Sequence, residues 1–464
     1  MLVDFKQNTE IQQIHRAQKD FFANNETKDV GFCIAQLEKI KGLIKANEDR
    51  LYEAIYADFG KSEFETYATE FSLLYHELNL FIKNIRKWSK KQRVSTGLAN
   101  FPAKSYTIAE PLGTTLVIGA WNYPYQLSLL PAITSLAAGN TVILKPSEMP
   151  ARTSAVMAEL VNNNFPAHYF QVVEGGVDET TYLLEQKFDK IFFTGSTQVG
   201  KIVYQAAAKH LTPVTLELGG KSPTIVMSDA DIKMTAKRIV WAKFLNAGQT
   251  CIAPDYILVE QSVEGKLIAA LKEEMGNYPQ QSDQQKEHYL KIINTKNFDR
   301  LTEMLDHDKI CYGGITNRAE RFISPTLMKD VTFEDAVMQE EIFGPILPVL
   351  SFTDLDTAIK KIKALPKPLS FYVYSKNRTI IEKLLREVSF GGGAINDSLM
   401  HVSNSNLPFG GVGGSGMGSY HGKTGFDAFS HRKSIIDKPF WLEPSVKYPP
   451  YTNGKLNLIK WLMG

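Results

Sequence analysis

One cysteine of this chain lies where it could act as a nucleophile. Cys251 follows Gly248 closely in the segment NAGQTCIAPDY, at the junction between a predicted helix and a predicted strand. The thiolate is the nucleophilic form of cysteine, and backbone N–H groups close to the sulfur would lower its pKa. An inert buried thiol is the competing interpretation, and on position alone it is the stronger one for Cys251 as well. It is stronger still for Cys33 and Cys311, which lie in ordinary apolar segments.

Two carboxylates and one amide occupy positions suited to proton transfer or charge stabilisation. Glu217 ends an apolar strand just before Gly219 and Gly220. An acid at the carboxyl end of a strand in an α/β sheet often faces a crevice, where it could act as a general base. Glu341, in QEEIFGPI, could equally be a paired structural acid. Asn122, in GAWNYPY, could donate to a developing oxyanion, although an ordinary turn residue would look the same.

A phosphate-binding turn is predicted at residues 195–200, where GSTQVG follows an apolar strand and opens a helix. Free N–H groups at the start of a helix suit a phosphate. A literal GxGxxG occurs at residues 411–416, but no strand precedes it and no clear helix follows, so we interpret it as a loop. Lys145 ends the strand TVILK, where the simplest interpretation is a side chain that reaches solvent.

The elements that must position these residues form two series of alternating strands and helices. Residues 9–92 precede them and are predicted to be helical, with capping boxes at Thr9–Gln12 and Ser62–Glu65. The predicted strands cover residues 114–120, 141–145, 170–175, 190–195 and 213–218 in the first series, and 222–227, 255–260, 345–352, 369–375 and 392–396 in the second. Their continuous apolar runs are typical of parallel strands covered on both faces. The sequence therefore predicts an α/β protein built from two packed open units.

Composition narrows the function classes. The 464 residues carry 52 Lys and Arg against 50 Asp and Glu, so the net charge of +2 disfavours nucleic acid as a main partner. Three cysteines cannot form a disulfide framework and favour a reducing, cytoplasmic location. The first residues do not resemble a signal peptide, and no run of about 18 apolar residues predicts a transmembrane helix. The C-terminal KLNLIKWLMG is expected to be a packed tail, with a weak membrane contact as the alternative.

Seven segments in a fixed order carry a family resemblance. GAWNYPY, LKPSE, FTGSTQVG, LELGGKSP, GQTC, EEIFGPI and LPFGGVGGSGMG resemble the successive motifs of the NAD(P)-dependent aldehyde dehydrogenase superfamily, over roughly residues 105–440. GQTCIAPDY and KYPPY are most similar to its class 3 branch, although Ala247 stands where class 3 members often carry a second cysteine. The resemblance implies oxidation of medium- or long-chain aliphatic or aromatic aldehydes by a homodimer.

The resemblance also implies an aldehyde dehydrogenase-like fold with a Rossmann-like cofactor domain, a catalytic domain and a small bridging sheet. The implied divisions are an NAD(P)-binding domain from residues 1–92 and 111–218, a catalytic domain from residues 219–427, bridging segments at 93–110 and 428–439, and a tail at 440–464. NAD is the implied cofactor, with NADP as an alternative.

Individual roles follow from the same resemblance. Cys251 is similar to the nucleophile, Asn122 and the Cys251 backbone N–H to the oxyanion hole, and Glu217 to the general base. The implied cofactor contacts are Trp121, Lys145, Glu148, Gly195, Ser196, Glu341 and Phe343. No metal site is expected.

Three other functions compete with this one. A CoA-acylating enzyme would release its thioester by thiolysis and would not need Glu217. A dehydrogenase with a narrow preference for a semialdehyde would share every motif. A catalytically inactive binding protein could keep the fold, although the joint presence of Cys251, Asn122 and Glu217 argues against it.

Overall fold

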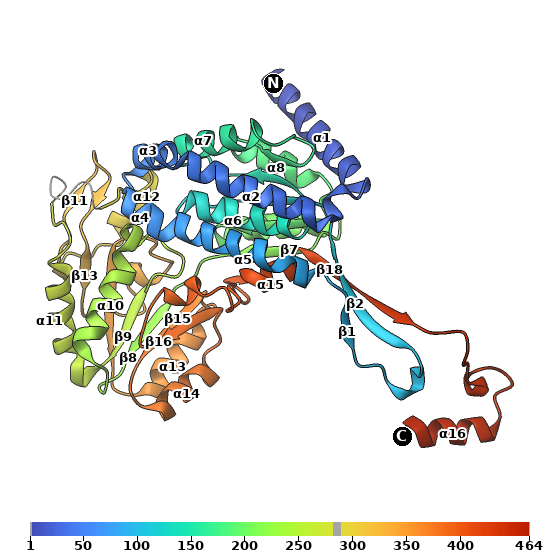
Figure 1. The fold of residues 1–464 in the computed structure, drawn as a ribbon. Coiled ribbons are helices and arrows are strands. Elements are labelled where there is room, and N and C mark those ends of the chain that lie inside the picture. The colour runs from blue at the N-terminus through green and yellow to red at the C-terminus, as the bar shows by residue number, and fades with distance from the viewer. Residues whose placement is uncertain (1, 282–288, 464) are drawn as a thin grey trace.

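Three sheets organise the chain. The computed structural model describes residues 2–281 and 289–463. A six-stranded sheet and a seven-stranded sheet form the centres of two α/β bodies, and a three-stranded sheet forms an arm that extends away from both (Figure 1). Met1, residues 282–288 and Gly464 lie outside the described residues. They belong to the predicted NAD(P)-binding domain, catalytic domain and tail, respectively.

The first body contains the six-stranded sheet, in the order β17-β7-β6-β3-β4-β5. Its strands are β3 (Thr114–Ile118), β4 (Thr141–Lys145), β5 (Phe170–Val172), β6 (Lys190–Thr194), β7 (Val214–Glu217) and β17 (Gly416–Met417). All the pairs are parallel except β17 with β7. The five predicted strands of the first series are therefore confirmed, β4 with the predicted bounds and the other four with slightly shorter ones.

Helices cover both faces of this sheet, because alternate side chains of its strands are apolar in both directions. Val142 and Leu144 belong to one buried cluster, whereas Ile143 between them belongs to another. Helix α6 (Pro124–Ala137) is buried along its whole length on the first face. The surrounding helices are α1 (Leu2–Ala23), α2 (Val30–Ala46), α3 (Glu48–Phe59), α5 (Ser72–Trp88), α7 (Ala151–Asn162), α8 (Val177–Glu185), α9 (Thr197–Ala208) and α15 (Gly422–Ala428).

The second body contains the seven-stranded sheet, in the order β10-β13-β14-β9-β8-β15-β16. Its strands are β8 (Pro223–Val226), β9 (Tyr256–Glu260), β10 (Ile310–Tyr312), β13 (Thr326–Met328), β14 (Ile346–Phe352), β15 (Ser370–Tyr374) and β16 (Gly392–Ile395). Its helices are α10 (Ile232–Phe244), α11 (Glu264–Met275), α12 (Thr295–Glu303), α13 (Leu355–Ala364) and α14 (Arg378–Glu387), and a small ribbon pairs β11 (Thr316–Asn317) with β12 (Phe322–Ile323). The second predicted series is confirmed, with β10, β13 and α12 as additions.

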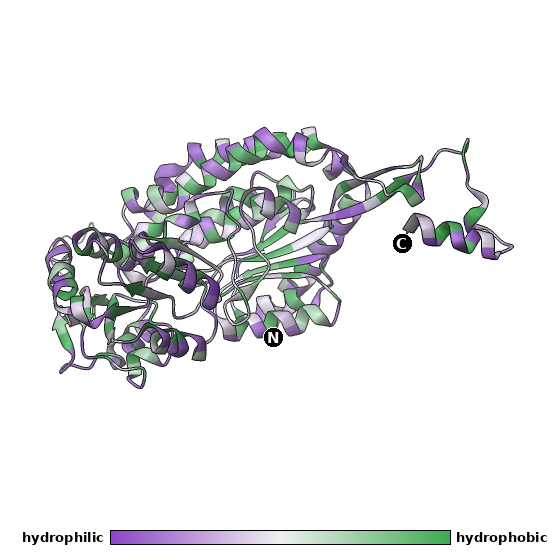
Figure 2. Ribbon diagram, turned by 90° about the horizontal axis from the view of Figure 1, so that it is seen from below, coloured by the Kyte–Doolittle hydropathy of each residue, from purple (hydrophilic) through white to green (hydrophobic). Residues whose placement is uncertain are grey.

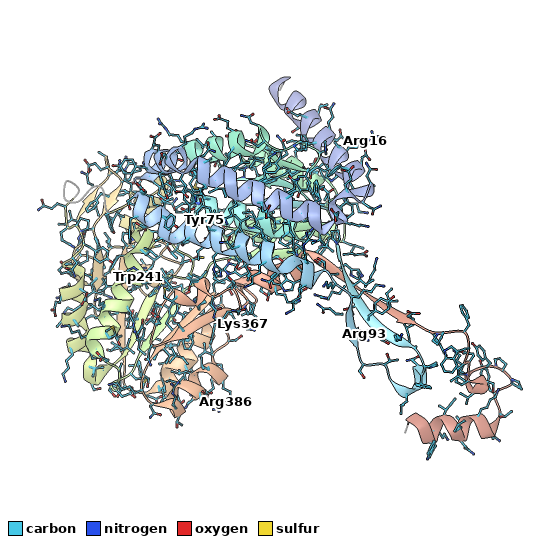
Figure 3. The ribbon with its side chains drawn as sticks, in the orientation of Figure 1. Arg16, Tyr75, Arg93, Trp241, Lys367 and Arg386 are labelled. Atoms are coloured by element: carbon cyan, nitrogen blue, oxygen red, sulfur yellow. The ribbon has the colours of Figure 1, made fainter. Side chains whose placement is uncertain are left out.

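The arm joins segments that lie far apart in the sequence. Strand β2 (Lys104–Pro111) pairs antiparallel with both β1 (Gln92–Val94) and β18 (Ser430–Asp437). Figure 3 places Arg93 on this arm, away from Tyr75 and Trp241 on the two bodies. Helix α16 (Asn453–Met463) lies beyond the arm in Figure 1, and Figure 2 shows hydrophobic bands along it. The described residues of the tail are mostly exposed and lie away from both bodies (Figure 1), which corrects the expectation of a packed tail.

Of the two predicted helix caps, the structure contradicts the one at Thr9 and places a helix start at Ser62. Thr9 lies inside α1, which begins at Leu2, so the predicted capping box at Thr9 is wrong. Ser62 does begin a helix, because its hydroxyl accepts from the Glu65 N–H at 3.2 Å at the start of α4 (Glu63–Thr66). Among the helices of the described residues, none combines the length and the apolar character needed to cross a membrane.

Candidate active site

The nucleophile candidate follows a strained turn between α10 and β9. Asn246, Ala247 and Gly248 all have left-handed backbones, with φ of 56°, 50° and 72°. Such a conformation is costly for the two residues that carry a Cβ, and it persists only where the surroundings enforce it. A Cβ at Gly248 would overlap the Gly344 carbonyl, so glycine is required there. The turn leaves Cys251 half-buried between the two bodies.

The pKa of Cys251 is raised, which corrects the expectation of a lowered value. Burial is the largest cause, and the negative charges of Glu341 and Glu217 add to it. The backbone N–H groups of Cys251 and Ile252 do lower the pKa, as predicted, but their effect is smaller than that of burial. The resting form of this residue is therefore the thiol, and its activation requires a proton acceptor.

Asn122 is held against the turn that precedes Cys251. It lies between β3 and α6 and is only 3% exposed. Its Nδ2 donates to the Gln249 carbonyl at 3.0 Å, and its own carbonyl accepts from Asn246 Nδ2 at 2.9 Å. An amide nitrogen has two hydrogens. One hydrogen therefore fixes the side chain, and the second is available to another acceptor.

Glu217 ends β7 as predicted and is 2% exposed. Within the described part of the chain, neither of its carboxylate oxygens has a hydrogen-bond partner. Burial raises its pKa well above the usual range. The charge of Glu217 is also one of the causes that raise the pKa of Cys251. A buried carboxyl without a partner is costly, and such groups concentrate at functional sites.

The turn around Glu341 is fixed from two sides. Asp255 accepts from the Ile342 N–H at 3.0 Å and forms an ion pair with Lys221 at 2.6 Å. Arg300, from α12, donates to the carbonyls of Glu341 and Ile342 at 3.2 and 2.8 Å.

The Glu341 carboxylate and the neighbouring rings form one wall of the site. The carboxylate packs so closely on Gly219 that a Cβ there would overlap it. Burial first, and then Asp255, raises the pKa of Glu341 to about 8. Phe343, with φ of 50°, packs against Trp121 with ring centroids 5.3 Å apart. Trp121, Glu341 and Phe343, three of the predicted cofactor contacts, therefore lie together.

The predicted phosphate turn caps α9. The Ser196 hydroxyl accepts from the Val199 N–H at 3.3 Å and thereby caps the helix. Ser196 itself is exposed. The Gly195 N–H donates to the Glu217 carbonyl at 3.0 Å, which removes that amide from any phosphate cradle. Thr197 Oγ1 donates to the Gly414 carbonyl at 3.1 Å. The 411–416 segment is thus a tight loop beside α9, as predicted.

Lys145 is buried at the end of β4, and the expectation that it reaches solvent is wrong. It is 1% exposed, its ammonium donates to the Pro146 carbonyl at 2.6 Å, and Glu148 lies 3.7 Å away. Burial lowers the pKa of Lys145, whereas Glu148 raises it. These two residues lie together, as predicted, with Glu148 about half exposed.

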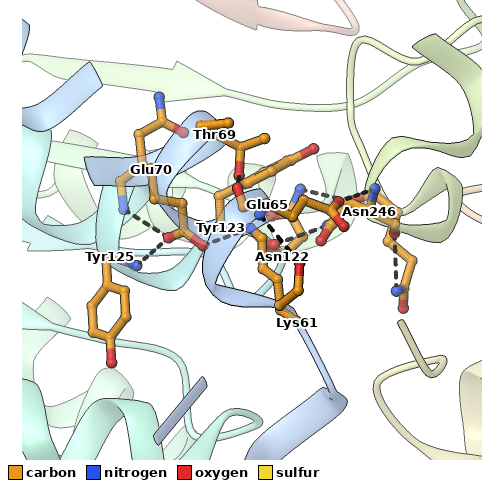
Figure 4. A network of polar contacts seen from close by, with 12 residues as sticks. Lys61, Glu65, Thr69, Glu70, Asn122, Tyr123, Tyr125 and Asn246 are labelled. Atoms are coloured by element: carbon orange, nitrogen blue, oxygen red, sulfur yellow. Dashed lines mark hydrogen bonds and ion pairs between the residues drawn. The ribbon is translucent and has the colours of Figure 1, made fainter. Parts of the chain in front are cut away.

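A charged network that sequence analysis missed lies directly behind Asn122 (Figure 4). Lys61 and Glu70 form an ion pair at 2.6 Å with both side chains 0% exposed, and Glu65 accepts from the Asn246 N–H at 2.6 Å. The sequence signal that could have revealed it is a lysine between two predicted helices, where a solvated residue was the simpler expectation.

These features fit a dinucleotide. The first turn of α9 is an exposed helix N-terminus, which suits a pyrophosphate. The Glu148 carboxylate could accept from ribose hydroxyls, and the carboxylate of Glu341 packs on a glycine beside an aromatic pair. In the described residues no group of three or more histidines, cysteines and acidic residues could hold a metal ion.

Comparisons with known proteins agree on one family. A family model described as aldehyde dehydrogenase family matches residues 5–435. A Staphylococcus aureus protein named 4,4'-diaponeurosporen-aldehyde dehydrogenase is 49% identical over 97% of this chain and 98% of its own length. A Rattus norvegicus protein named dimeric NADP-preferring aldehyde dehydrogenase is 43% identical over 93% of this chain and 96% of its own. A substrate-bound structure of Staphylococcus aureus AldH aligns with a TM-score of 0.95, 48% identity and coverage of 98% and 99%.

Proposed function

This chain belongs to the aldehyde dehydrogenase family, and from that premise we propose that it oxidises medium- or long-chain aliphatic or aromatic aldehydes to carboxylic acids by way of a Cys251 thioester. It has the aldehyde dehydrogenase fold and is an oxidoreductase that acts on aldehydes with NAD(P). Its named relatives place it on a class 3-like branch.

The first half of the proposed reaction takes place at Cys251 and Asn122. The Cys251 S–H bond breaks with its proton passing to a water molecule, and the sulfur forms a bond to the aldehyde carbon to give a thiohemiacetal. The negative charge that develops on the oxygen is stabilised by the second hydrogen of Asn122 Nδ2 and by the Cys251 backbone N–H. Gln249 and Asn246 hold the Asn122 amide in place before the substrate arrives.

Glu217 completes the proposed reaction. NAD(P), when bound, supplies the acceptor for the hydride. Loss of this hydride from the thiohemiacetal carbon leaves a thioester on Cys251. Glu217 then takes a proton from water, the water oxygen bonds to the acyl carbon, and the carbon–sulfur bond breaks. The observation that carries this proposal is the buried Glu217 carboxyl, which has no hydrogen-bond partner among the described residues and whose charge raises the pKa of Cys251. A CoA-acylating function would leave this costly group without a task.

One assay separates the proposed function from its alternatives. Purified protein is mixed with NAD and with hexanal, benzaldehyde, a long-chain aldehyde or 4,4'-diaponeurosporen-aldehyde, and absorbance at 340 nm is followed without CoA. We expect NADH formation. Turnover only after CoA is added would identify an acylating enzyme, and activity confined to a semialdehyde would identify a narrow specificity. Binding of NAD without turnover would identify an inactive binding protein.

NAD is the proposed preferred cofactor. A carboxylate at Glu148 accepts from the 2′- and 3′-hydroxyls of the adenine ribose and repels a 2′-phosphate, while the buried Lys145 ammonium is already bonded. We expect a higher kcat/KM with NAD than with NADP, and a relative gain for NADP of about tenfold, or 1.4 kcal/mol, in Glu148→Gln. Glu185→Gln, at an exposed carboxylate that ends α8, is the control. A tenfold or greater preference of the parent for NADP would contradict the proposal.

We propose that the first body is the NAD(P)-binding domain (predicted as residues 1–92 and 111–218) and the second body is the catalytic domain (predicted as residues 219–427). Each encloses one of the two large sheets. The end of the predicted catalytic range is corrected, because β17 and α15 return to the first body. The bridging segments at 93–110 and 428–439 form the arm. We also propose a cytoplasmic location for the protein, because its three cysteines are free thiols.

A homodimer is the proposed assembly. Strand β18 pairs only with β2 among the described residues, so its eight-residue outer edge is open to another strand. The tail beyond it exposes Phe440, Trp441 and Trp461. Light scattering at micromolar concentration should give twice the 52.1 kDa chain mass. A monomer would contradict this assembly, and a monomer that also sediments with anionic lipid vesicles would favour the weak membrane contact of the tail.

A further inference from the structure

We propose that Glu65 is a positioning residue for the reaction described above, and that the Lys61–Glu65–Glu70 network aligns the turn before Cys251 with Asn122 (Figure 4). Glu65 touches neither the reacting atoms nor the expected cofactor contacts. The inference rests on the proposed function, but the contact it describes can be measured without turnover.

The Lys61–Glu70 ion pair fixes one end of the network. One Glu70 oxygen accepts from Lys61 at 2.6 Å, and the other accepts from the N–H groups of Tyr125 and Gln126 at 2.8 and 3.1 Å. These N–H groups belong to the first turn of α6, where a carboxylate is favoured by the helix dipole. The pair thus anchors the 61–70 segment to the helix that begins immediately after Asn122.

Glu65, in the same 61–70 segment, contacts the second body. In a complete capping box its carboxylate would return to the N–H of the capping residue. Here Ser62 caps the helix, but the Glu65 carboxylate accepts from the Asn246 N–H, 181 residues further along the chain. Glu65 therefore bonds to the turn of the second body rather than to the start of its own helix.

A π-helical turn lies between Glu65 and the end of the 61–70 segment. The segment Tyr67–Phe71 follows α4 as a π-helix, which joins residues five apart. Glu65 and Glu70 are five residues apart, whereas on an α-helix they would point in different directions. Burial raises the pKa of Glu65, while Lys61 and the Asn246 N–H lower it. The Lys61 ammonium thus pairs with Glu70, and its positive charge also favours the ionised form of Glu65.

The Asn246 bond matters because the turn is strained. Asn246 and Ala247 hold left-handed conformations, which are unfavourable for residues that carry a Cβ. Glu65 fixes the Asn246 backbone, and the Asn246 side chain donates to the carbonyls of Asn122 and Gln249 at 2.9 and 3.0 Å. Two successive contacts therefore connect Glu65 to the main chain of Asn122, whose side-chain amide we assign to the oxyanion, and the Gln249 carbonyl accepts from both asparagine side chains.

A second connection ends beside the nucleophile. The Lys61 ammonium lies 4.2 Å from the centre of the Tyr123 ring, and the Tyr123 hydroxyl bonds to Thr250 Oγ1 at 2.6 Å. Thr250 directly precedes Cys251. The network thus contacts residues immediately before or after both groups that must meet the aldehyde, and it does so from the side of the 61–70 segment.

Two substitutions at Glu65 and one control test the proposal by kinetics. Glu65→Ala removes the acceptor, and we expect kcat to fall about 10- to 100-fold, with the aldehyde KM and the NAD dissociation constant within about twofold of the parent. Glu65→Gln keeps an oxygen acceptor and should restore kcat to within about threefold. Glu63→Ala, an exposed acid in the same helix, should leave all three unchanged.

Amide hydrogen exchange gives the readout that does not require turnover. A peptide covering residues 244–250 should lose protection in Glu65→Ala and keep it in Glu65→Gln. Unchanged protection or an unchanged kcat in Glu65→Ala would overturn the proposal. It would also be overturned if Glu65→Ala and Glu65→Gln lost kcat and NAD affinity equally and both had a lower thermal midpoint, because that pattern indicates general destabilisation. If the parent shows no aldehyde turnover, the proposed function fails while the exchange result alone decides whether Glu65 holds the turn.

Discussion

Cys251→Ala loses NADH formation by at least about 10³-fold, while its NAD dissociation constant stays within about twofold of the parent. The loss is large because no other group can form the covalent bond to the aldehyde carbon, and the remaining groups supply only binding and charge stabilisation. The cofactor affinity is preserved because the contacts we assign to it lie on other elements, at Glu148, Ser196 and Glu341. Absorbance at 340 nm and fluorescence titration measure the two quantities.

The other two cysteines provide matched controls for this result. Cys33 is 4% exposed and donates to the Thr27 carbonyl in the first body, and Cys311 lies on the edge strand β10 of the second. Cys33→Ala and Cys311→Ala should each keep more than half of the parent activity. Residual activity above about a tenth in Cys251→Ala, or its loss in Cys311→Ala alone, would assign the nucleophile elsewhere.

Glu217→Gln gives a single burst of about one NADH per site and then stalls, with steady-state turnover about 10²- to 10⁴-fold below the parent. The burst survives because formation of the thioester does not need this base in the proposed sequence. The stall follows because glutamine cannot accept a proton from water. Stopped-flow absorbance at 340 nm resolves the two phases, and mass spectrometry should show the acyl group on the peptide that contains Cys251.

Hydroxylamine distinguishes this defect from general damage. It attacks thioesters without a general base, so it should restore repeated NADH formation in Glu217→Gln and have no effect in Cys251→Ala. The absence of any burst in Glu217→Gln would show that the carboxylate is needed before hydride transfer, as an acceptor for the thiol proton.

The same residue sets a pH dependence for the second half-reaction. Burial raises the pKa of Glu217, which means that the neutral carboxyl persists to higher pH than usual. Only the ionised form can act as a base, so thioester hydrolysis in the parent should accelerate as pH rises through that pKa. Glu217→Gln should lose this rise.

The sequence indicated the strands of both large sheets because each is a short, continuously apolar run between turn residues. Runs such as TVILK at β4 and LSFYVYS around β15 cannot form one-sided strands without exposing apolar side chains. Strands β10 and β13 escaped notice because three residues carry too little periodicity to be distinguished from a loop. The helix α8 was missed because its nine residues are mostly polar and its cap is Gly176.

Site positions were predictable where chemistry depends on a local turn, and not where it depends on distant partners. The structure places Asn122, Glu217 and Cys251 at the ends of elements, as the motifs indicated. The net direction of the Cys251 pKa shift depends on burial and on Glu341, 90 residues away, and no local pattern reports either. The Glu65 contact escaped for the same reason, since its capping motif was satisfied without the carboxylate.

The pairing of β17 with β7 has a mechanical consequence. The chain leaves the first sheet after Glu217, builds the second body, and returns at Gly416, the residue paired with Glu217. Leu218 also donates to the Ser415 carbonyl at 3.0 Å, so the outgoing and returning strands are clasped together. The two chain segments that join the bodies at this point are thus bonded to each other, and Glu217 lies on the outgoing one. Because Asn246 also bonds to Glu65 and Asn122 of the first body, the second body cannot rotate about this point without breaking those contacts, so the spacing between nucleophile and base is held at both places.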